Sequence, residues 1–139
     1  MKRMIKKLSE RRGDFTISGA FKILLVVALV VIFISIGGVL MTWNKVNMLS
    51  SEIVRYIELQ GRVDSSVYDK IDELKDSTNL NVTVDIDASC ISGTDRIQFG
   101  GQFTVTLTYE ASFGLGGVFQ TPIELHATAT GRSEKYWKT

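Results

Sequence analysis

Hydrophobic and polar positions divide the chain into one long apolar run and a series of shorter periodic segments. The run extends from Ile23 to Trp43, "ILLVVALVVIFISIGGVLMTW", without a single charged residue. A helix of that length spans about 30 Å, the thickness of the hydrocarbon core of a bilayer. Lys22 can reach the interface at one end, and Trp43 suits the interface at the other. We therefore predict a transmembrane helix over residues 14–43.

Helical periodicity continues beyond this run, without a proline. In "NKVNMLSSEIVRYIELQGRV" the apolar residues recur mostly at steps of three or four, and polar residues fill most of the opposite side. The apolar positions are Val46, Leu49, Ile53, Tyr56, Ile57 and Val63. We predict one continuous helix from about Ile17 to Gln60, with residues 44–63 as an amphipathic stalk. Gly37 and Gly38 mark either a bend in this helix or a close approach of another helix.

A second, short helix is predicted over residues 64–79, "DSSVYDKIDELKDSTN". Asp64 or Ser65 can cap its start, and residues 77–79 break it. Its apolar residues share one face: Val67, Ile71 and Leu74.

Three segments then alternate apolar and polar residues with a period of two, over residues 81–87, 102–111 and 122–130. This pattern predicts an antiparallel sheet that is covered on one face only. The apolar stripe of the stalk is the natural cover. The predicted fold class is α+β, with residues 64–139 forming the domain outside the membrane.

Charge adds an orientation to this layout. Residues 1–22 carry seven Lys and Arg against two acidic residues, whereas residues 44–139 carry nine against thirteen. Basic residues flanking a span remain in the cytoplasm. We therefore expect a basic cytoplasmic leader over residues 1–13, a single span, and an acidic domain outside the cell membrane.

A competing interpretation of the apolar run is a cleaved signal peptide. Ser35–Gly37, "SIG", fits the small-x-small pattern of signal peptidase and follows an apolar core. Cleavage there would release a soluble domain that begins at Gly38. The apolar run continues through Leu40 and Met41, however, which favours a span.

Candidate chemistry is sparse. There is no phosphate loop, metal triad or nucleophile arrangement, so we expect no enzyme activity, no cofactor and no nucleic-acid partner. Cys90 is the only cysteine and His126 the only histidine, which excludes an internal disulfide and a Cys/His zinc site. Asp85, Asp87 and Asp95 could supply oxygen ligands to calcium, but their spacing matches no calcium loop.

The connection "SFGLGGVFQTP", residues 112–122, combines glycines with large apolar residues. Two interpretations stay open. It is a plain hairpin loop that folds back on the core, or an exposed apolar tip that contacts a neighbouring subunit or the membrane surface. The residues concerned are Phe113, Leu115, Val118 and Phe119.

The order of these elements resembles type IV pilins and pseudopilins, and more narrowly the TadE-like pseudopilins of Tad/Flp pilus systems. "RRGDFTISGAF" resembles the family's opening, and "SSEIVRYIELQG" its stalk just beyond the membrane. "FTVTLTYEAS" and "IELHATATGRSEKYW" resemble its paired C-terminal strands. The resemblance covers nearly the whole chain through degenerate motifs.

This resemblance implies a processing site. Gly13 matches the position after which prepilin peptidase cuts, and Asp14 would become the new N-terminus. Ser18 matches the acidic position of the family but carries no charge, so it cannot form an ion pair with the N-terminal amine of a neighbour. Asp14 also stands where the family prefers an apolar residue. Both departures fit a minor component or a relative that has lost cleavage, and the basic stretch before Gly13 is otherwise an uncleaved anchor.

The function that the resemblance implies is a non-catalytic pseudopilin-like subunit or assembly factor of a bacterial pilus or a related secretion or conjugation apparatus. Its partners would be membrane lipid and other pilin or pseudopilin subunits, with helices packing through Gly19, Gly37 and Gly38. It would reside in the cell membrane or in a surface filament. The alternative is a membrane-anchored extracellular binding module that does not polymerise.

Overall fold

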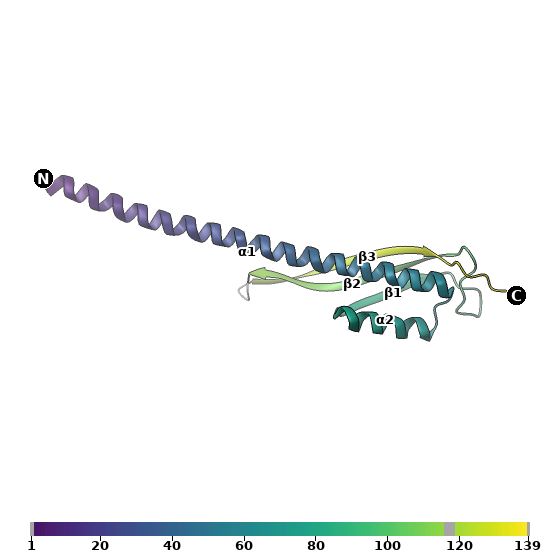
Figure 1. The fold of residues 1–139 in the computed structure, drawn as a ribbon. Helices are drawn as coiled ribbons and strands as arrows, with labels where there is room; N and C mark the ends of the chain where they lie inside the picture. The colour runs from purple at the N-terminus through teal and green to yellow at the C-terminus, as the bar shows by residue number, and fades with distance from the viewer. Residues whose placement is uncertain (1, 116–118, 139) are drawn as a thin grey trace.

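The computed structural model describes residues 2–115 and 119–138, with side chains for residues 17–113 and 120–138. A long helix, α1 (Lys2–Gln60), is followed by a short helix, α2 (Ser65–Thr78). Three strands complete the chain: β1 (Val82–Ala88), β2 (Gln102–Leu115) and β3 (Phe119–Arg132). They form one antiparallel sheet in the order β1-β2-β3, so the fold is α+β as the sequence predicted (Figure 1).

Helix α1 is a single rod that joins the apolar run to the stalk. Its 59 residues correspond to a length of about 89 Å. The helix continues through Gly37 and Gly38, so neither residue interrupts it. One end of the rod lies against the sheet, and the other projects far beyond it (Figure 1).

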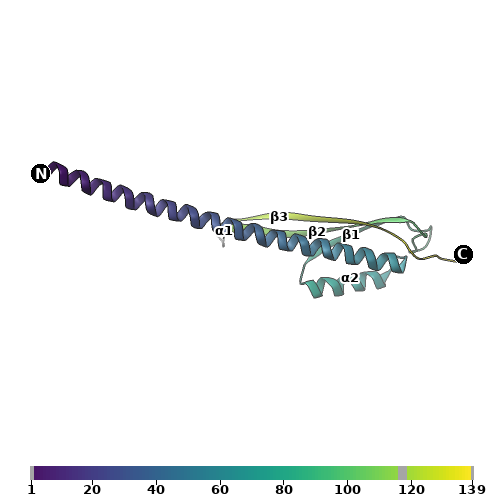
Figure 2. The same ribbon diagram turned by 45° about the horizontal axis from the view of Figure 1, so that its top comes forward.

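The core lies between the stalk part of α1 and one face of the sheet. The predicted stripe is confirmed, because Val46, Leu49, Ile53 and Ile57 are all buried. They belong to the same apolar cluster as the inward-facing residues of the sheet, which are Val82, Phe103, Val105, Leu107 and Ala127. Figure 2, turned from the first view, shows both helices on the same side of the sheet.

Helix α2 begins and ends with caps that its sequence encodes. The Asp64 carboxylate accepts a hydrogen bond from the Ser66 backbone N–H at 3.1 Å, which satisfies a free N–H of the first turn. Asn79, in the left-handed conformation with φ 53°, ends the helix, and its N–H donates to Asp76 O and Lys75 O. The three predicted apolar residues are buried against the core: Val67, Ile71 and Leu74.

The outer face of the sheet is polar, as the alternation predicted. Threonines lie opposite one another in the register, including the pairs Thr83 with Thr108 and Thr104 with Thr130. The Oγ1 atoms of Thr104 and Thr130 are 3.4 Å apart. His126 is exposed on this face and its Nδ1 lies 3.1 Å from Thr108 Oγ1.

The β2–β3 hairpin is longer than the sequence analysis predicted. Strands were expected to end at Ala111 and to resume at Pro122, but the pairing continues outward to Leu115 and Phe119. The alternation of Ala111, Phe113 and Leu115 extends the strand period, and Gly114, which pairs with Gln120, does not interrupt the ladder. The expected loop over residues 112–122 is therefore wrong, and the connection itself lies outside the described residues.

The far end of the domain is closed by two segments without regular structure. Ile97, in the loop between β1 and β2, is fully buried, and its N–H donates to Gly61 O at 2.8 Å. The same carbonyl accepts from the Trp137 indole Nε1 at 3.1 Å. Gly61 has a positive φ of 64°, and a side chain there would meet Lys135 Cβ at 2.6 Å. The C-terminal segment is therefore folded onto the end of α1, where only glycine leaves room for it.

Candidate functional site

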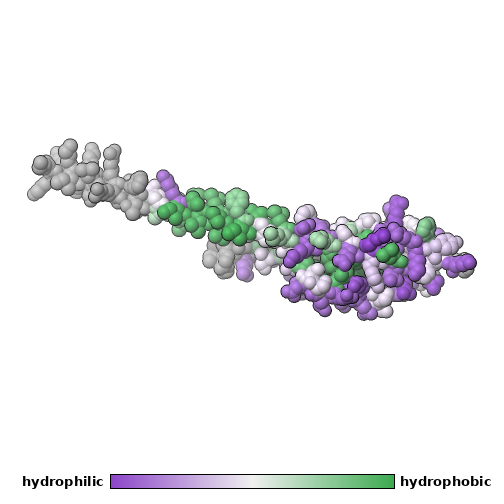
Figure 3. Space-filling view, viewed as in Figure 1, coloured by the Kyte–Doolittle hydropathy of each residue, from purple (hydrophilic) through white to green (hydrophobic). Residues whose placement is uncertain are grey.

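The most prominent surface of the molecule is the uncovered part of α1 before Val46. It contains the apolar run of residues 23–43, and we call that run the apolar half of α1. Among the residues with described side chains, none before Val46 is buried. Large apolar residues are exposed along the whole stretch, including Phe21 at 66%, Phe33 at 72% and Met41 at 72%. Figure 3 shows this stretch as a green band between the domain and the start of the helix.

Soluble monomeric proteins rarely expose a continuous apolar surface of this extent, because its contact with water is unfavourable. Within Ile17–Gln60, α1 contains one stretch that is long and apolar enough to cross a membrane, and none of that stretch is buried inside the molecule. These features are consistent with a single-pass membrane protein. They agree with the span predicted from the sequence.

The residues implied in processing and assembly all lie on this helix. Gly13 and Asp14 are within α1, in the part whose side chains lie outside the described residues. Ser18 is exposed. Gly19, Gly37 and Gly38 have nothing within 4 Å of the position that a Cβ would take. The glycines therefore serve no close packing within this chain, and their sides are open to other molecules.

The β2–β3 hairpin lies beside the apolar half of α1. The sequence pattern did not predict this position. We call residues 110–115 and 119–124 the hairpin arm, because β1 pairs with β2 only as far as Tyr109. The arm borders an open cleft against the helix. The cleft is lined by Ser35, Gly38, Val39 and Thr42 on α1, by Ala111 and Ser112 on the arm, and by Tyr109 just before the arm.

The residues of α1 that line the cleft recur at helical spacing. Ser35, Gly38, Val39 and Thr42 recur at steps of three, one and three, which places them on one face of α1. The two hydroxyls bond within the helix, Ser35 Oγ to Val31 O at 3.0 Å and Thr42 Oγ1 to Gly38 O at 3.1 Å. Such bonds let a polar side chain sit in apolar surroundings.

The four apolar residues assigned to the connection differ in their position and in how much of them the structure describes. Phe113 lies on the arm and is half-buried. Leu115 and Phe119 are paired in the backbone register, but their side chains lie outside the described residues, as does Val118 altogether. The neighbouring Ala111 is 8% exposed. The start of the arm is therefore covered by α1, while the arm as a whole extends beyond the three-stranded part of the sheet.

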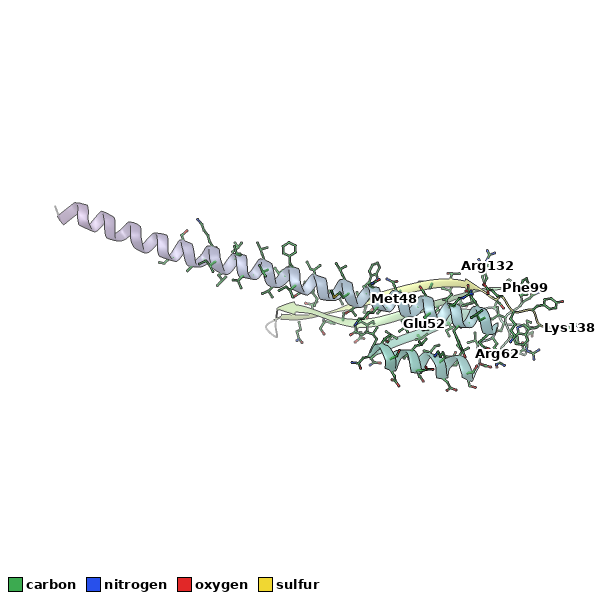
Figure 4. The ribbon with its side chains drawn as sticks, in the orientation of Figure 1. Met48, Glu52, Arg62, Phe99, Arg132 and Lys138 are labelled. Carbon is green, nitrogen blue, oxygen red and sulfur yellow. The ribbon has the colours of Figure 1, made fainter. Side chains whose placement is uncertain are left out.

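A second exposed cluster lies at the opposite end of the domain. Phe99 and Tyr136 form an edge-to-face pair with ring centroids 6.3 Å apart. Beside them, Arg96 and Lys135 lie over the ring of Trp137 at 4.6 and 4.9 Å from its centroid. Figure 4 labels Phe99, Arg62 and Lys138 at this end of the molecule. Trp137 docks on the domain, whereas Tyr136 is exposed.

The described titratable groups include two cations whose pKa values are raised by surface carboxylates. Hydrogen bonds from Arg55 to Glu134 and Glu58 raise the pKa of Arg55, and a hydrogen bond to Glu73 raises the pKa of Lys70. Among the described residues, no three His, Cys, Asp or Glu side chains lie together so that they could hold a metal ion. Asp85, Asp87 and Asp95 are exposed and form no such group.

Comparison with known proteins gives one match. The model of a family described as "Domain of unknown function (DUF4320)" matches residues 23–138, which include the apolar half of α1, the stalk and the sheet. No curated protein and no solved structure matches the chain.

Proposed function

For this chain, which belongs to the DUF4320 family, we propose a role as a non-catalytic, pilin-like subunit or assembly factor of a bacterial pilus or a related secretion or conjugation apparatus. The work of such a subunit is assembly. Its apolar helix packs with other helices in the membrane, and its outer domain presents surfaces to neighbouring subunits.

One observation carries the proposal: α1 continues without interruption from an uncovered apolar half into a stalk that bears the whole domain. A helix that only anchored a domain would need no rigid connection to it. Here the stalk supplies core residues to the domain, so a force or a contact on the apolar half is transmitted directly to the sheet. This coupling suits a subunit that is moved or packed through its helix.

The orientation in this proposal follows from charge. Residues 1–22 are strongly basic, so they stay in the cytoplasm and the domain lies outside. Residues 44–139 carry a net negative charge. Prepilin peptidase, acting from the cytoplasmic side, would then find the Gly13–Asp14 bond on the side where it cuts.

Cysteine cross-linking in native membranes tests assembly. Phe33→Cys places a thiol on the uncovered helix, and Cys90→Ser removes the natural exposed thiol. Because the double variant has one thiol per chain, oxidation should join neighbouring subunits into a disulfide-linked dimer. The unmodified protein, with Cys90 alone, is the control for collisions outside the membrane. A double variant that stays monomeric under oxidation contradicts the proposal.

The mass of the mature protein and its N-terminal residue test processing. A chain that begins at Asp14 supports prepilin-type cleavage. An intact leader supports a permanently anchored protein, and a start at Gly38 supports release by signal peptidase and contradicts membrane assembly.

A second candidate is a membrane-anchored extracellular binding module that does not polymerise. Two observations favour it. Ser18 provides no carboxylate for an ion pair with a neighbour, and the hairpin arm already lies beside one face of α1 between Ser35 and Thr42. The exposed Phe99 and Tyr136 pair at the far end would then be the place to look for a partner. Absence of the cross-linked dimer would favour this candidate.

A further inference from the structure

We infer that the end of the hairpin arm rests in the interfacial layer of the outer leaflet, and that the hydrocarbon span of α1 therefore ends near Ser35–Gly38 instead of at Trp43. The partner of the arm is a lipid surface. The inference rests on the membrane anchoring and orientation proposed above, and it concerns how deep the protein sits.

The first step is the height of the arm along α1. Ala111 and Ser112 lie beside residues 35–42 of the helix. Strand β2 then continues to Leu115, three residues or about 10 Å further toward the apolar half of α1. That distance equals about seven residues of helix. Figure 1 accordingly shows the end of β2 beside the apolar half of α1, well beyond β1.

The second step is the distribution of charge at this height. The sequence from Ala111 to Ile123 contains no charged residue. Glu110 and Glu124, which are partners in the β2–β3 register, are the charges that flank it. On α1 the corresponding charge is Lys45, one turn beyond Thr42. The helix and the arm thus change from charged to uncharged at about the same level, as expected for two elements that enter one interface together.

The third step limits how deep the arm can go. Beyond Tyr109 it is a ribbon of two strands, and none of the described residues forms a third strand beside it. Unpaired backbone groups at such edges are costly in hydrocarbon, where no water satisfies them. A span over residues 23–43 would immerse the arm deeply. A shallow position, with apolar side chains such as Phe113 about 5–10 Å into the boundary of headgroups and acyl chains, avoids that cost.

The helix can accommodate this shift. A span that ends at Ile36 and contains 20 residues begins at Ile17 and measures about 30 Å. Lys22 then lies inside the cytoplasmic edge, and its long side chain reaches back to the headgroups. Met41 and Trp43 are raised into the outer headgroup layer, where tryptophan is favoured.

Depth measurements on the full-length protein in vesicles test the inference. Single cysteines are introduced into the Cys90→Ser background at Ser112 and Thr121 on the arm, at Thr128 on the sheet, and at Phe33 and Met41 on α1. Each is spin-labelled in vesicles of phosphatidylethanolamine and phosphatidylglycerol. Accessibility to oxygen, which concentrates in lipid, is compared with accessibility to a water-soluble nickel chelate.

We expect Ser112 and Thr121 to lie at the interface together with Met41, Phe33 to lie in the hydrocarbon, and Thr128 to lie in water. Labels at Ser112 and Thr121 that are as aqueous as Thr128 would overturn the inference. So would a Met41 label in the hydrocarbon. Protection of the arm that vanishes when the protein is diluted in lipid would assign the contact to a second copy, which also overturns it. A Phe33 label in water would contradict the membrane anchor itself, and thus the proposed function.

Discussion

Gly131 lies where β3 crosses the stalk, and no side chain fits there. A Cβ at this position would lie 2.6 Å from Val54 Cγ1, 2.7 Å from Phe103 Cζ and 2.9 Å from Glu58 Oε1. Because the site is buried and all three distances are below van der Waals contact, Gly131→Ala should lower the free energy of unfolding by about 1–3 kcal/mol. Denaturant unfolding followed by circular dichroism measures this loss.

Gly38→Ala is the matched control for that substitution. Nothing lies within 4 Å of the Cβ that it would introduce, and alanine favours a helix over glycine by about 1 kcal/mol. The outer domain should therefore lose no stability. Equal losses in the two variants would contradict the assignment of Gly131 to a close contact.

The lowered pKa of Asp64 should make the stability of the protein depend on pH. A hydrogen bond from the Ser66 hydroxyl lowers the pKa of Asp64 below its ordinary value of 3.8, with the charge of Arg62 and backbone N–H groups adding to the effect against a smaller opposing effect of burial. A carboxyl group whose pKa is lower in the folded state stabilises fully above the unfolded pKa. That contribution is lost as the pH falls through the folded pKa.

The stability of the protein should therefore decline below about pH 4 in part through Asp64. Asp64→Asn keeps an amide oxygen that can cap α2 but does not ionise in this range. The difference in melting temperature between the two proteins should shrink between pH 5 and about pH 2. A difference that stays constant over this range would show that the charge of Asp64 contributes nothing.

At the scale of elements, periodicity was sufficient for the helices and for the inner part of the sheet. Three local patterns correctly predicted the packing. They are the apolar stripe from Val46 to Ile57, the cap at Asp64 and the alternation around Val105. The extra length of the hairpin was also present in the alternation of Ala111, Phe113 and Leu115. Pro122 was interpreted there as a loop signal, although an edge strand such as β3 tolerates it.

Long-range contacts made by single residues could not be predicted from the pattern. Ile97 is fully buried but is flanked by polar residues without a period. Trp137 bonds to Gly61, which is 76 residues away in the chain. The position of the arm beside Ser35 and Thr42 depends on the length of the hairpin relative to the helix. These features depend on the tertiary arrangement of the helices and strands, which local sequence patterns do not determine.

Glu58 joins the end of α1 to the end of β3. Its Oε1 accepts from the Arg132 N–H at 3.1 Å, and its main-chain O accepts from the Glu134 N–H at 3.0 Å. Glu58→Ala removes the first of these bonds, so amide exchange at Arg132 should accelerate and stability should fall by about 1–2 kcal/mol. Hydrogen exchange measured by NMR or mass spectrometry locates the effect.

Glu58→Gln retains an acceptor oxygen and should lose less than the alanine variant. If the two variants lose equally, the ion pair with Arg55 at 3.3 Å, and not the bond to the strand, is the stabilising contact.

At the scale of the whole molecule, the core and the apolar half of α1 are separable. Among the residues with described side chains, every buried one lies at or beyond Val46. Within the described part of the chain, the apolar half of α1 borders the domain at the cleft beside the hairpin arm. The domain therefore needs the stalk but not the apolar half of α1, and the arm is the part that depends on both.

A fragment of residues 44–138 should accordingly fold cooperatively, with sheet and helix signals in circular dichroism and slow amide exchange in β2 near Val105. Exchange on the arm, at residues 110–115 and 119–124, should be faster than in a fragment of residues 35–138, because only the longer fragment retains Ser35, Gly38 and Thr42 beside it. Failure of the shorter fragment to fold would show that the apolar half stabilises the core. Equal protection of the arm in both fragments would show that the ribbon is stable without the helix, and that its position beside α1 is not maintained by contact with it.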